Sequence, residues 1–430
     1  MSYQMLFAVV SFVVLFILIS TEKFNKTILA LFGAFLFISI GIIPQEKAFL
    51  AEDWNVIFLL IGMMIIVGIT KHTGLFQFVA VKMVKWAKGR PFVVMIYLCL
   101  VTALFSALLD NVTTVLILTP ITILVTVELG LKPIPFIIAE AISSNVGGTA
   151  TLIGDPPNIM IGSAVGLSFM DFVVNLTPVV LICLALFIGM AWFFWGRTMY
   201  VSNERRARVM EFDEYKFLQD RRLLIVSLTV LGLVIVGFLV HSLIHLEAAT
   251  IAMAGASLLM LLSGKHEVDK FFEEVEWGTI FFFLGLFILV GGLVEVGAIK
   301  KLAEFFLSLT GGDIKNTTLL ILWVSGLFSG VVDNIPYVAT MIPLIKEMGT
   351  ADPALAGNAA LLLPVWWALS LGACLGGNAT LIGASANVVS AGLSAKSGYP
   401  ISFLEFTKYG VVITLAHLAV CTVYLLIVYF

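Results

Sequence analysis

Two aspartates in otherwise apolar sequence are the residues of this chain best suited to chemistry. Asp110 lies in LLDNVTTVLILTPI and Asp333 in VVDNIPYVATMIPL, each followed by an asparagine, Asn111 or Asn334, with Thr113 close behind in the first copy. An ionised carboxylate at that depth in a membrane is costly unless it is paired or faces water. The pattern therefore predicts two polar turns that line a central cavity and bind a proton or a cation. A short extramembrane turn is the alternative, because Asp-Asn also favours turns.

A second polar element follows each aspartate. The first copy reads GGTATLIGDPPN and the second GGNATLIGASAN. A Gly-Gly pair frees backbone groups that lipid cannot satisfy, so such a helix break is tolerated beside a cavity. Close helix packing is the alternative use of these glycines. The predicted breaks are at Gly147, Gly148, Gly376 and Gly377, and the polar side chains expected to bind substrate or protons around them are Asn145, Thr149, Asn158, Asn378, Thr380 and Asn387.

Some acidic residues have no such repeat. Asp155 stands where the second copy has Ala384, and Glu140 stands where it has Leu369. Asp155 is either a further proton-binding or gating residue, or the N-cap of a helix that starts with proline. Glu140 faces either the cavity or a neighbouring helix. Glu276, which precedes an apolar segment, is interpreted as part of a solvated helix start.

The elements that position these residues must be membrane helices. The 430-residue chain is 60% hydrophobic and 12% charged, whereas soluble domains carry about twice that charge. Apolar runs long enough to span a bilayer recur along its length, which predicts an all-α polytopic protein of the cell (inner) membrane. The first run, residues 3–20, lacks a basic leader and a cleavage site, so we expect it to span as well. Single spans are predicted near 4–20, 27–43, 55–70, 172–196, 223–241, 246–263, 277–293 and 406–428.

Basic residues predict the orientation of these spans. Lys and Arg concentrate in segments 71–90 and 197–222. Because cytoplasmic loops carry an excess of positive charge, we place both segments on the cytoplasmic side. The other segments that then fall on that side are 21–26, 128–133, 264–276 and 395–408.

The chain is also a duplication. Asp110, Asn111 and Pro120 pair with Asp333, Asn334 and Pro343 at one constant offset in residue number. Each half has an odd number of net crossings if the segment around its aspartate returns to its starting side, so the second half is inverted relative to the first. We therefore predict a first inverted repeat over 1–196, a cytoplasmic linker over 197–222 and a second inverted repeat over 223–430. Each repeat contains a re-entrant helical hairpin and a discontinuous helix, with about ten crossings in all.

Several other functions lack their sequence signals. The four cysteines are isolated in apolar segments, so we expect neither disulfides nor a metal site. We expect no bound cofactor. No phosphate-binding GxxxxGK[ST] loop occurs, so ATP coupling would need a separate subunit. An intramembrane aspartyl protease is a different class of function, but the Gly-x-Gly-Asp motif of such enzymes is absent before Asp155. A channel is the third option, and only the inverted repeat separates it from a carrier. The net charge of -3 gives no reason to expect a nucleic-acid partner.

The motifs LDNVTTVLILTPI and AEAISSNVGGTATLIGDPPN, with their echoes in the second half, resemble the ion transporter superfamily. More narrowly, they are similar to its group of arsenite-efflux proteins, sodium/proton antiporters and melanosomal P proteins. The resemblance covers essentially the whole chain. It implies a homodimer in which a transport part moves against a scaffold. Dicarboxylate carriers of that superfamily have Ser-Asn-Thr at the hairpin tips, where this chain has Asp110 and Asp333.

This difference guides the expected substrate. Two carboxylates in one cavity disfavour an anion and favour a cation, or a neutral hydroxylated solute, exchanged for protons. The resemblance then favours proton-coupled efflux of arsenite or antimonite by alternating access. A Na+ or Li+/proton antiporter of the same fold is the close alternative, because carboxylates and unwound carbonyls suit hard cations.

Overall fold

The computed structural model describes residues 3–21, 23–264, 268–351 and 359–430, and over these residues the chain is helical, without strands. Eight helices in the described ranges are long and apolar enough to cross a membrane. This confirms the prediction of an all-α polytopic membrane protein. These helices are α1 (Tyr3–Ser20), α4 (Trp54–Lys71), α6 (Pro91–Leu108), α7 (Asn111–Glu128), α10 (Phe169–Phe194), α12 (Arg221–Val240), α15 (Trp277–Glu295) and α21 (Phe403–Tyr429).

Shorter helices complete the fold. The apolar ones are α2 (Lys26–Ser39), α13 (Ala248–Leu262), α17 (Ile314–Ser329) and α19 (Leu363–Gly376). Those that flank the motifs are α8 (Ile134–Gly148), α9 (Pro156–Val165), α18 (Asn334–Ala351) and α20 (Ser385–Lys396). The remainder are α3 (Gln45–Leu50), α5 (Leu75–Trp86), α11 (Asn203–Met210), α14 (Val268–Phe272), α16 (Ala298–Thr310) and the 3-10 turns Gly196–Thr198, Glu214–Phe217 and Ala359–Leu362.

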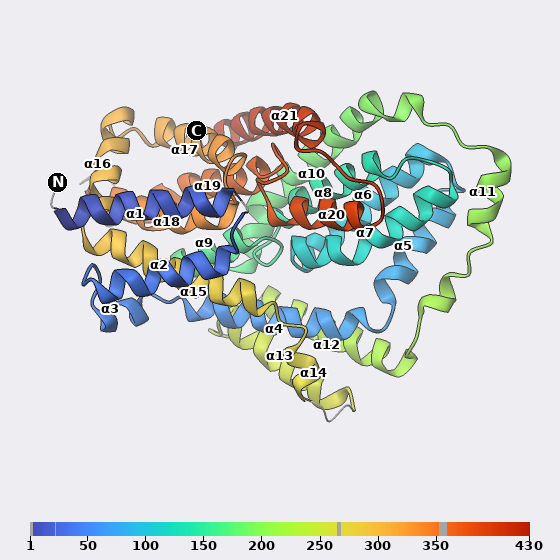
Figure 1. The fold of residues 1–430 in the computed structure, drawn as a ribbon, viewed down its shortest axis with the longest axis horizontal. Helices are drawn as coiled ribbons and strands as arrows, with labels where there is room; N and C mark the ends of the chain where they lie inside the picture. The colour runs from blue at the N-terminus through green and yellow to red at the C-terminus, as the bar shows by residue number, and fades with distance from the viewer. Residues whose placement is uncertain (1–2, 22, 265–267, 352–358) are drawn as a thin grey trace.

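The helix pairs that pack together repeat between the halves. Helix α4 packs on α13, and its counterpart α15 packs on α2. A Cβ atom added to Gly62 would lie 2.7 Å from the backbone of Ala252, and one added to the equivalent Gly285 would lie 2.6 Å from that of Ala30. Small residues at these crossings let the backbones approach closely, which is how membrane helices associate without a hydrophobic driving force. These four helices lie together in the lower part of Figure 1.

The motif-bearing helices form a second repeated arrangement. Helix α6 packs on α8, and α17 packs on α19 in the same way. Helix α7 packs on α20, and α18 packs on α9, so each hairpin contacts the broken helix of the opposite half. These contacts between the halves bring the two Asp-Asn tips close to the two Gly-Gly breaks. The division into two repeats joined by a linker, which includes α11 at the right of Figure 1, stays a prediction.

Two amphipathic helices were missed by the sequence analysis. Helix α5 lies in the segment expected to be a cytoplasmic loop, and α16 lies in its counterpart after α15. Each follows a glycine with a left-handed backbone, Gly74 at φ 78° and Gly297 at φ 74°. Only glycine adopts that conformation readily, so the chain turns sharply there and starts a new helix. Their mixed composition hides them from a search for long apolar runs.

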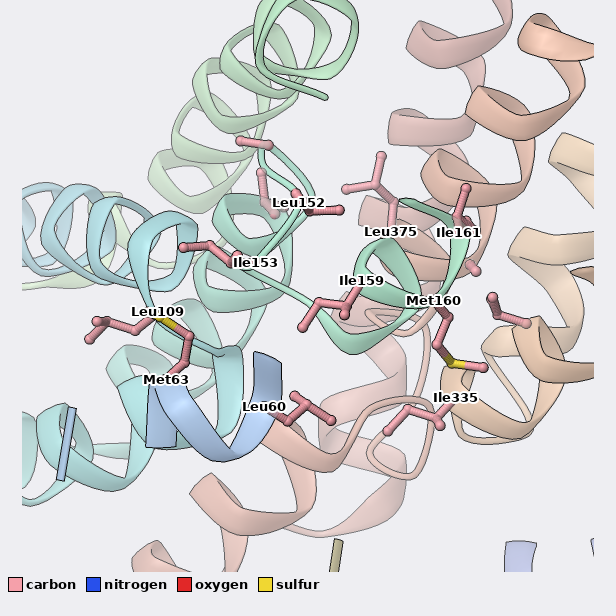
Figure 2. Close-up of a cluster of buried hydrophobic side chains, with 14 of the residues drawn as sticks. Leu60, Met63, Leu109, Leu152, Ile153, Ile159, Met160, Ile161, Ile335 and Leu375 are labelled. Atoms are coloured by element: carbon pink, nitrogen blue, oxygen red, sulfur yellow. The ribbon is translucent and has the colours of Figure 1, made fainter. Parts of the chain in front are cut away.

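A buried apolar cluster surrounds the first helix break. Figure 2 shows that α4, the break, α9 and the two hairpins all contribute to it. These apolar side chains pack around the break and exclude water from it. They include Leu60, Met63, Leu109, Leu152, Ile153, Ile159, Met160, Ile161, Ile335 and Leu375.

Candidate functional site

Each predicted aspartate begins the second arm of a hairpin. Asp110 follows α6 and caps α7, with its Oδ1 accepting a hydrogen bond from the backbone N–H of Thr113 at 2.7 Å. Asp333 precedes α18, and its Oδ1 accepts from the backbone N–H of Ile335 at 3.2 Å. One oxygen of each aspartate thus satisfies a free N–H group at a helix start. The other oxygen remains for further chemistry. Thr113 contributes its backbone to this cap and does not line the cavity described next.

Both hairpin tips line one cavity of about 360 Å³, here called the inner cavity. Asp110 and Asn111 approach it from the first half, and Asp333 and Asn334 from the second. Asp155 lines it too, at the start of α9. Side chains from the α1–α2 connection, α4, α15 and α20 complete the lining, among them Ser20, Phe24, Lys26, Leu60, Met64, Glu276, Thr279, Ser385, Val388 and Val389.

The three aspartates of this cavity have different partners. Asp333 Oδ2 forms an ion pair with Lys26 Nζ at 2.9 Å and accepts from Ser385 Oγ at 3.0 Å. Asp155 occupies the N-cap position of α9 but makes no capping bond. Instead both its oxygens lie 3.3 Å from Nδ2 of Asn334, which donates to them. This contact favours the cavity interpretation of Asp155 over the helix-cap interpretation. Among the described residues, no ion pair joins Asp110.

A chain of amides joins the first hairpin tip to the two helix breaks. Asn111 Nδ2 donates to Asn145 Oδ1 at 3.3 Å. Asn145 Nδ2 lies 2.9 Å from both Asn378 Oδ1 and Asn387 Oδ1, in the other half. The Nδ2 group of Asn378 is buried and has no partner among the described residues. The structure therefore brings four of the predicted asparagines into direct contact.

The remaining predicted residues hold the breaks themselves. Asn158 donates through Nδ2 to the carbonyl oxygens of Thr149 and Thr151, and Asn387 donates to those of Gly377 and Thr380. These bonds satisfy carbonyl groups that the broken helices leave free. The hydroxyl of Thr149 donates within its own helix, and that of Thr380 donates to Gly330 O. None of these four predicted residues, Thr149, Asn158, Thr380 and Asn387, lines the inner cavity, and their role in binding stays a prediction.

The glycines end their helices and also allow close packing. Helix α8 ends at Gly148 and α19 at Gly376. A Cβ atom on Gly147 would lie 2.2 Å from Ala103 O, and one on Gly376 would lie 2.5 Å from Gly326 O. Gly148 and Gly377 likewise face the backbones of Gly154 and Gly383. Both interpretations of the Gly-Gly pairs therefore apply at once.

The inner cavity has a counterpart on the other side of the motifs. This outer pocket, of about 420 Å³, is lined by Lys47, Asp53, Met160, Phe287, Glu295, Ala339 and Lys346, among others. Two residues of the outer pocket, Asp53 and Ala339, are the repeat equivalents of the inner-cavity residues Glu276 and Leu116. The offset in residue number is the one that relates Asp110 to Asp333. The offset of the breaks relates Met160 to Val389. None of the three aspartates Asp110, Asp155 and Asp333 lines the outer pocket.

Sequence reasoning missed Lys26, Ser385 and Glu276. Lys26 was counted among loop lysines, although it is the first residue of an apolar helix and follows an Asn25 cap. Glu276 was interpreted as part of a solvated helix start; it is the N-cap residue of α15 and also lines the inner cavity, where burial and the nearby Asp110 raise its pKa. Its equivalence to Asp53, also an N-cap residue, was the available signal. Glu140 faces a neighbouring helix, where it accepts from Thr119 and Thr122.

This arrangement, with two broken helices and two hairpins meeting at a polar centre, is typical of secondary transporters. A model of the CitMHS family, described as a citrate transporter, matches residues 16–372. The chain belongs to the CitMHS family.

Relatives of this CitMHS chain are also transporters or membrane proteins. It is 45% identical to an uncharacterized transporter of Mycobacterium tuberculosis, over 98% of both chains. It is 43% identical to a 46 kDa membrane protein of Mycobacterium leprae, over 97% of both. The mouse P protein is 33% identical over 95% of this chain and 58% of that protein. The expected relation to P proteins is confirmed, and the CitMHS chain is a multi-pass membrane transporter.

A solved structure shares the fold. The YdaH transporter of Alcanivorax borkumensis superposes with a TM-score of 0.57 over 86% of this chain and 84% of that one, at 15% identity. At that identity the likeness concerns the fold of the CitMHS chain and not its substrate.

Proposed function

We propose that this CitMHS protein is a proton-coupled antiporter that exports arsenite or antimonite by alternating access. The observation that carries the proposal is the charge of the inner cavity. Its lining includes Asp110, Asp155, Asp333 and Glu276, with Lys26 as the one basic side chain among the described residues. Carboxylates beside a water-accessible cavity in a membrane are the usual carriers of transported protons.

The same charge argues against an anionic substrate. Citrate, which the family description names, would bring its own carboxylates toward those of the cavity. A single ammonium, already paired with Asp333, cannot offset this repulsion. A cation or an uncharged solute is therefore the better match.

Arsenite is an uncharged trihydroxide near neutral pH, and its hydroxyl groups need both donors and acceptors. Carboxylates of the lining accept, and the amides of Asn111 and Asn334 lie beside them. No cysteine lines the cavity among the described residues, so binding would depend on oxygen and nitrogen atoms rather than thiolates. Na+ or Li+ is the second candidate, because hard cations also prefer oxygen ligands.

In the proposed cycle, substrate enters the inner cavity when the tip aspartates are deprotonated. The protein then rearranges so that the outer pocket reaches the tips. Protonation of the aspartates from outside releases the substrate, and the protons return with the protein to the inside. The expected homodimer remains a prediction of the resemblance, and ATP coupling would still need the separate subunit expected from the missing phosphate-binding loop.

Everted vesicles with an acidic interior test this function. Arsenite, Na+, Li+ and citrate are added in turn, while uptake and collapse of the pH gradient are followed. We expect arsenite uptake that dissipates the gradient and falls by at least about tenfold in Asp110→Asn and in Asp333→Asn. The matched control is Asp313→Asn, since Asp313 also caps a hairpin helix through the N–H of Asn316 but is exposed.

The outcomes separate the candidates. A response to Na+ or Li+ but not to arsenite would support proton coupling and would show that the substrate is a cation instead of arsenite. Citrate uptake that survives in Asp110→Asn would refute the charge argument. Equal loss in Asp313→Asn would show that the substitutions act through folding.

A further inference from the structure

Lys26 is the one lysine, among the described residues, that lines the inner cavity. Its Nζ atom donates to Asp333 Oδ2 and to Ser385 Oγ, both at 2.9 Å, and lies 5.0 Å from the centre of the Phe282 ring. Ser385 closes the triangle by donating to Asp333. The side chain of Asp333 is 13% exposed and that of Lys26 33%. The pair is therefore well oriented and largely withdrawn from water, where ion pairs are less screened.

The arrangement exists in one half alone. The residue equivalent to Lys26 is Ala249, and the residue equivalent to Ser385 is Pro156. Asp110 accordingly has neither partner. The two tips are thus alike in sequence but differ in charge: one carboxylate is neutralised by the protein itself, and the other is open to a proton or a substrate.

The ion pair also joins two sets of helices. Lys26 starts α2, which packs on α1 and α15, whereas Asp333 directly precedes α18 and Ser385 starts α20. A tethered ammonium acts at an effective concentration far above that of a dilute free ion. Any proton or cation carried on Asp333 must therefore compete with Lys26 once the tip reaches the position seen here.

We propose that Lys26 is a coupling residue that displaces the inward-carried proton from Asp333. This inference rests on the proposed proton-coupled antiport. When the tip arrives at the inner cavity, Asp333 changes from carboxylic acid to carboxylate, its proton passes to cytoplasmic water, and Lys26 stays an ammonium throughout. Ser385 orients the carboxylate by donating to the same oxygen. Glu276, Asp110 and Asp155 are the other acids of the cavity, and none of them is paired with Lys26.

The first test needs no substrate. In a Val388→Cys background, the labelling rates of a cationic and an anionic thiol reagent of equal size are compared, because Val388 lines the inner cavity and the native cysteines are buried. We expect Lys26→Gln to raise the cationic-to-anionic ratio by at least about tenfold, since it removes the positive charge of the cavity. Lys26→Arg should keep the ratio of the parent. Lys23→Gln, at an exposed lysine on the same connection, is the matched control.

The second test counts protons. In proteoliposomes, Lys26→Gln should release one proton fewer per substrate than the parent, while Lys26→Arg and Lys23→Gln should keep the parent ratio. An unchanged proton count in Lys26→Gln, or a reagent ratio equal to that of Lys23→Gln, would overturn the proposal. If the parent transports none of the tested solutes but Lys26→Gln still shifts the reagent ratio, the proposed substrates are wrong. The inference that Lys26 controls the charge of the cavity is then still supported. A reagent ratio that shifts equally in Lys26→Arg would mean altered packing, and would also overturn it.

Discussion

The inner cavity and the outer pocket share several equivalent positions, yet Asp110, Asp155 and Asp333 line the inner cavity alone. On the inner side, Val389 of α20 is partly exposed, and the lining extends to Asp110 and Asp333. On the outer side, the equivalent Met160 of α9 is 2% exposed and packed in the apolar cluster of Figure 2. The difference between the two sides is thus one of packing around a shared framework.

This comparison explains how one chain can serve two faces of a membrane. If the halves are inverted copies, each side can adopt the arrangement now seen on the other. In this structure the tip aspartates line the cavity on the inner side, which the basic segments predict to be cytoplasmic. Differences that persist between equivalent positions, such as Lys26 against Ala249, then make the two faces of the protein unequal, whereas the direction of net transport is set by the solute and proton gradients.

The largest expected effect concerns the framework that both sides share. Gly147→Ala and Gly376→Ala place a Cβ atom 2.2 Å and 2.5 Å from the backbone oxygens of Ala103 and Gly326, which are themselves equivalent. Backbone cannot move aside as a side chain can, so each substitution should destabilise the protein by about 3 kcal/mol or prevent folding. Thermal unfolding in detergent measures the effect.

Two glycines provide matched controls for these substitutions. Gly189 in α10 and Gly232 in α12 have nothing within 4 Å of an added Cβ. Gly189→Ala and Gly232→Ala should therefore be neutral, or stabilising by up to about 1 kcal/mol. A large cost in one half and none in the other would contradict the shared framework.

The hairpin tips and helix breaks were predictable from sequence because polar and helix-breaking residues are rare within membrane spans unless they line a cavity. Asp-Asn and Gly-Gly within apolar sequence predicted the two hairpin tips and breaks that the structure has. The partners of these residues were not predictable, because they come from distant segments. Nothing near Asp333 in the chain indicates that Lys26 or Ser385 lies against it. The amphipathic helices α5 and α16 were not predicted for another reason: a search for apolar runs does not detect helices that are polar on one face.

A smaller effect, in labelling rate, tests the difference between the two sides directly. Val389→Cys should react with a membrane-impermeant thiol reagent at the inner face at least about tenfold faster than Met160→Cys reacts at the outer face, because a thiol must be accessible to react. Everted vesicles and intact cells present the two faces separately. The four native cysteines are buried, which keeps the background low.

Each result of this labelling has a clear meaning. Equal rates would show that both sides are open to similar extents, and the comparison would fail. Reaction of Val389→Cys from intact cells alone would reverse the orientation predicted from the basic segments. Addition of the transported solute should slow labelling of Val389→Cys, because it occupies the inner cavity.

The smallest expected effect comes from an acid that only the outer side has. Glu52 precedes the outer-pocket residue Asp53, and its equivalent is the apolar Val275. Burial raises the pKa of Glu52 from 4.5 to about 8, and its Oε2 atom has no hydrogen-bond partner among the described residues. The folded protein therefore holds this proton more tightly than the unfolded chain. The resulting stabilisation is complete below pH 4.5 and is lost as the pH rises through about 8.

Glu52→Gln should remove that part of the pH dependence and leave the melting temperature unchanged where the acid is already protonated. Since the side chain is partly exposed, solvent reduces the effect to on the order of 1 kcal/mol at alkaline pH. Melting curves at several pH values between 4.5 and 8 measure it. Glu46→Gln, at an exposed glutamate of the nearby α3, is the control. If both variants follow the parent curve, Glu52 is hydrated in the protein, and the outer side is more open than the packing of Met160 indicates.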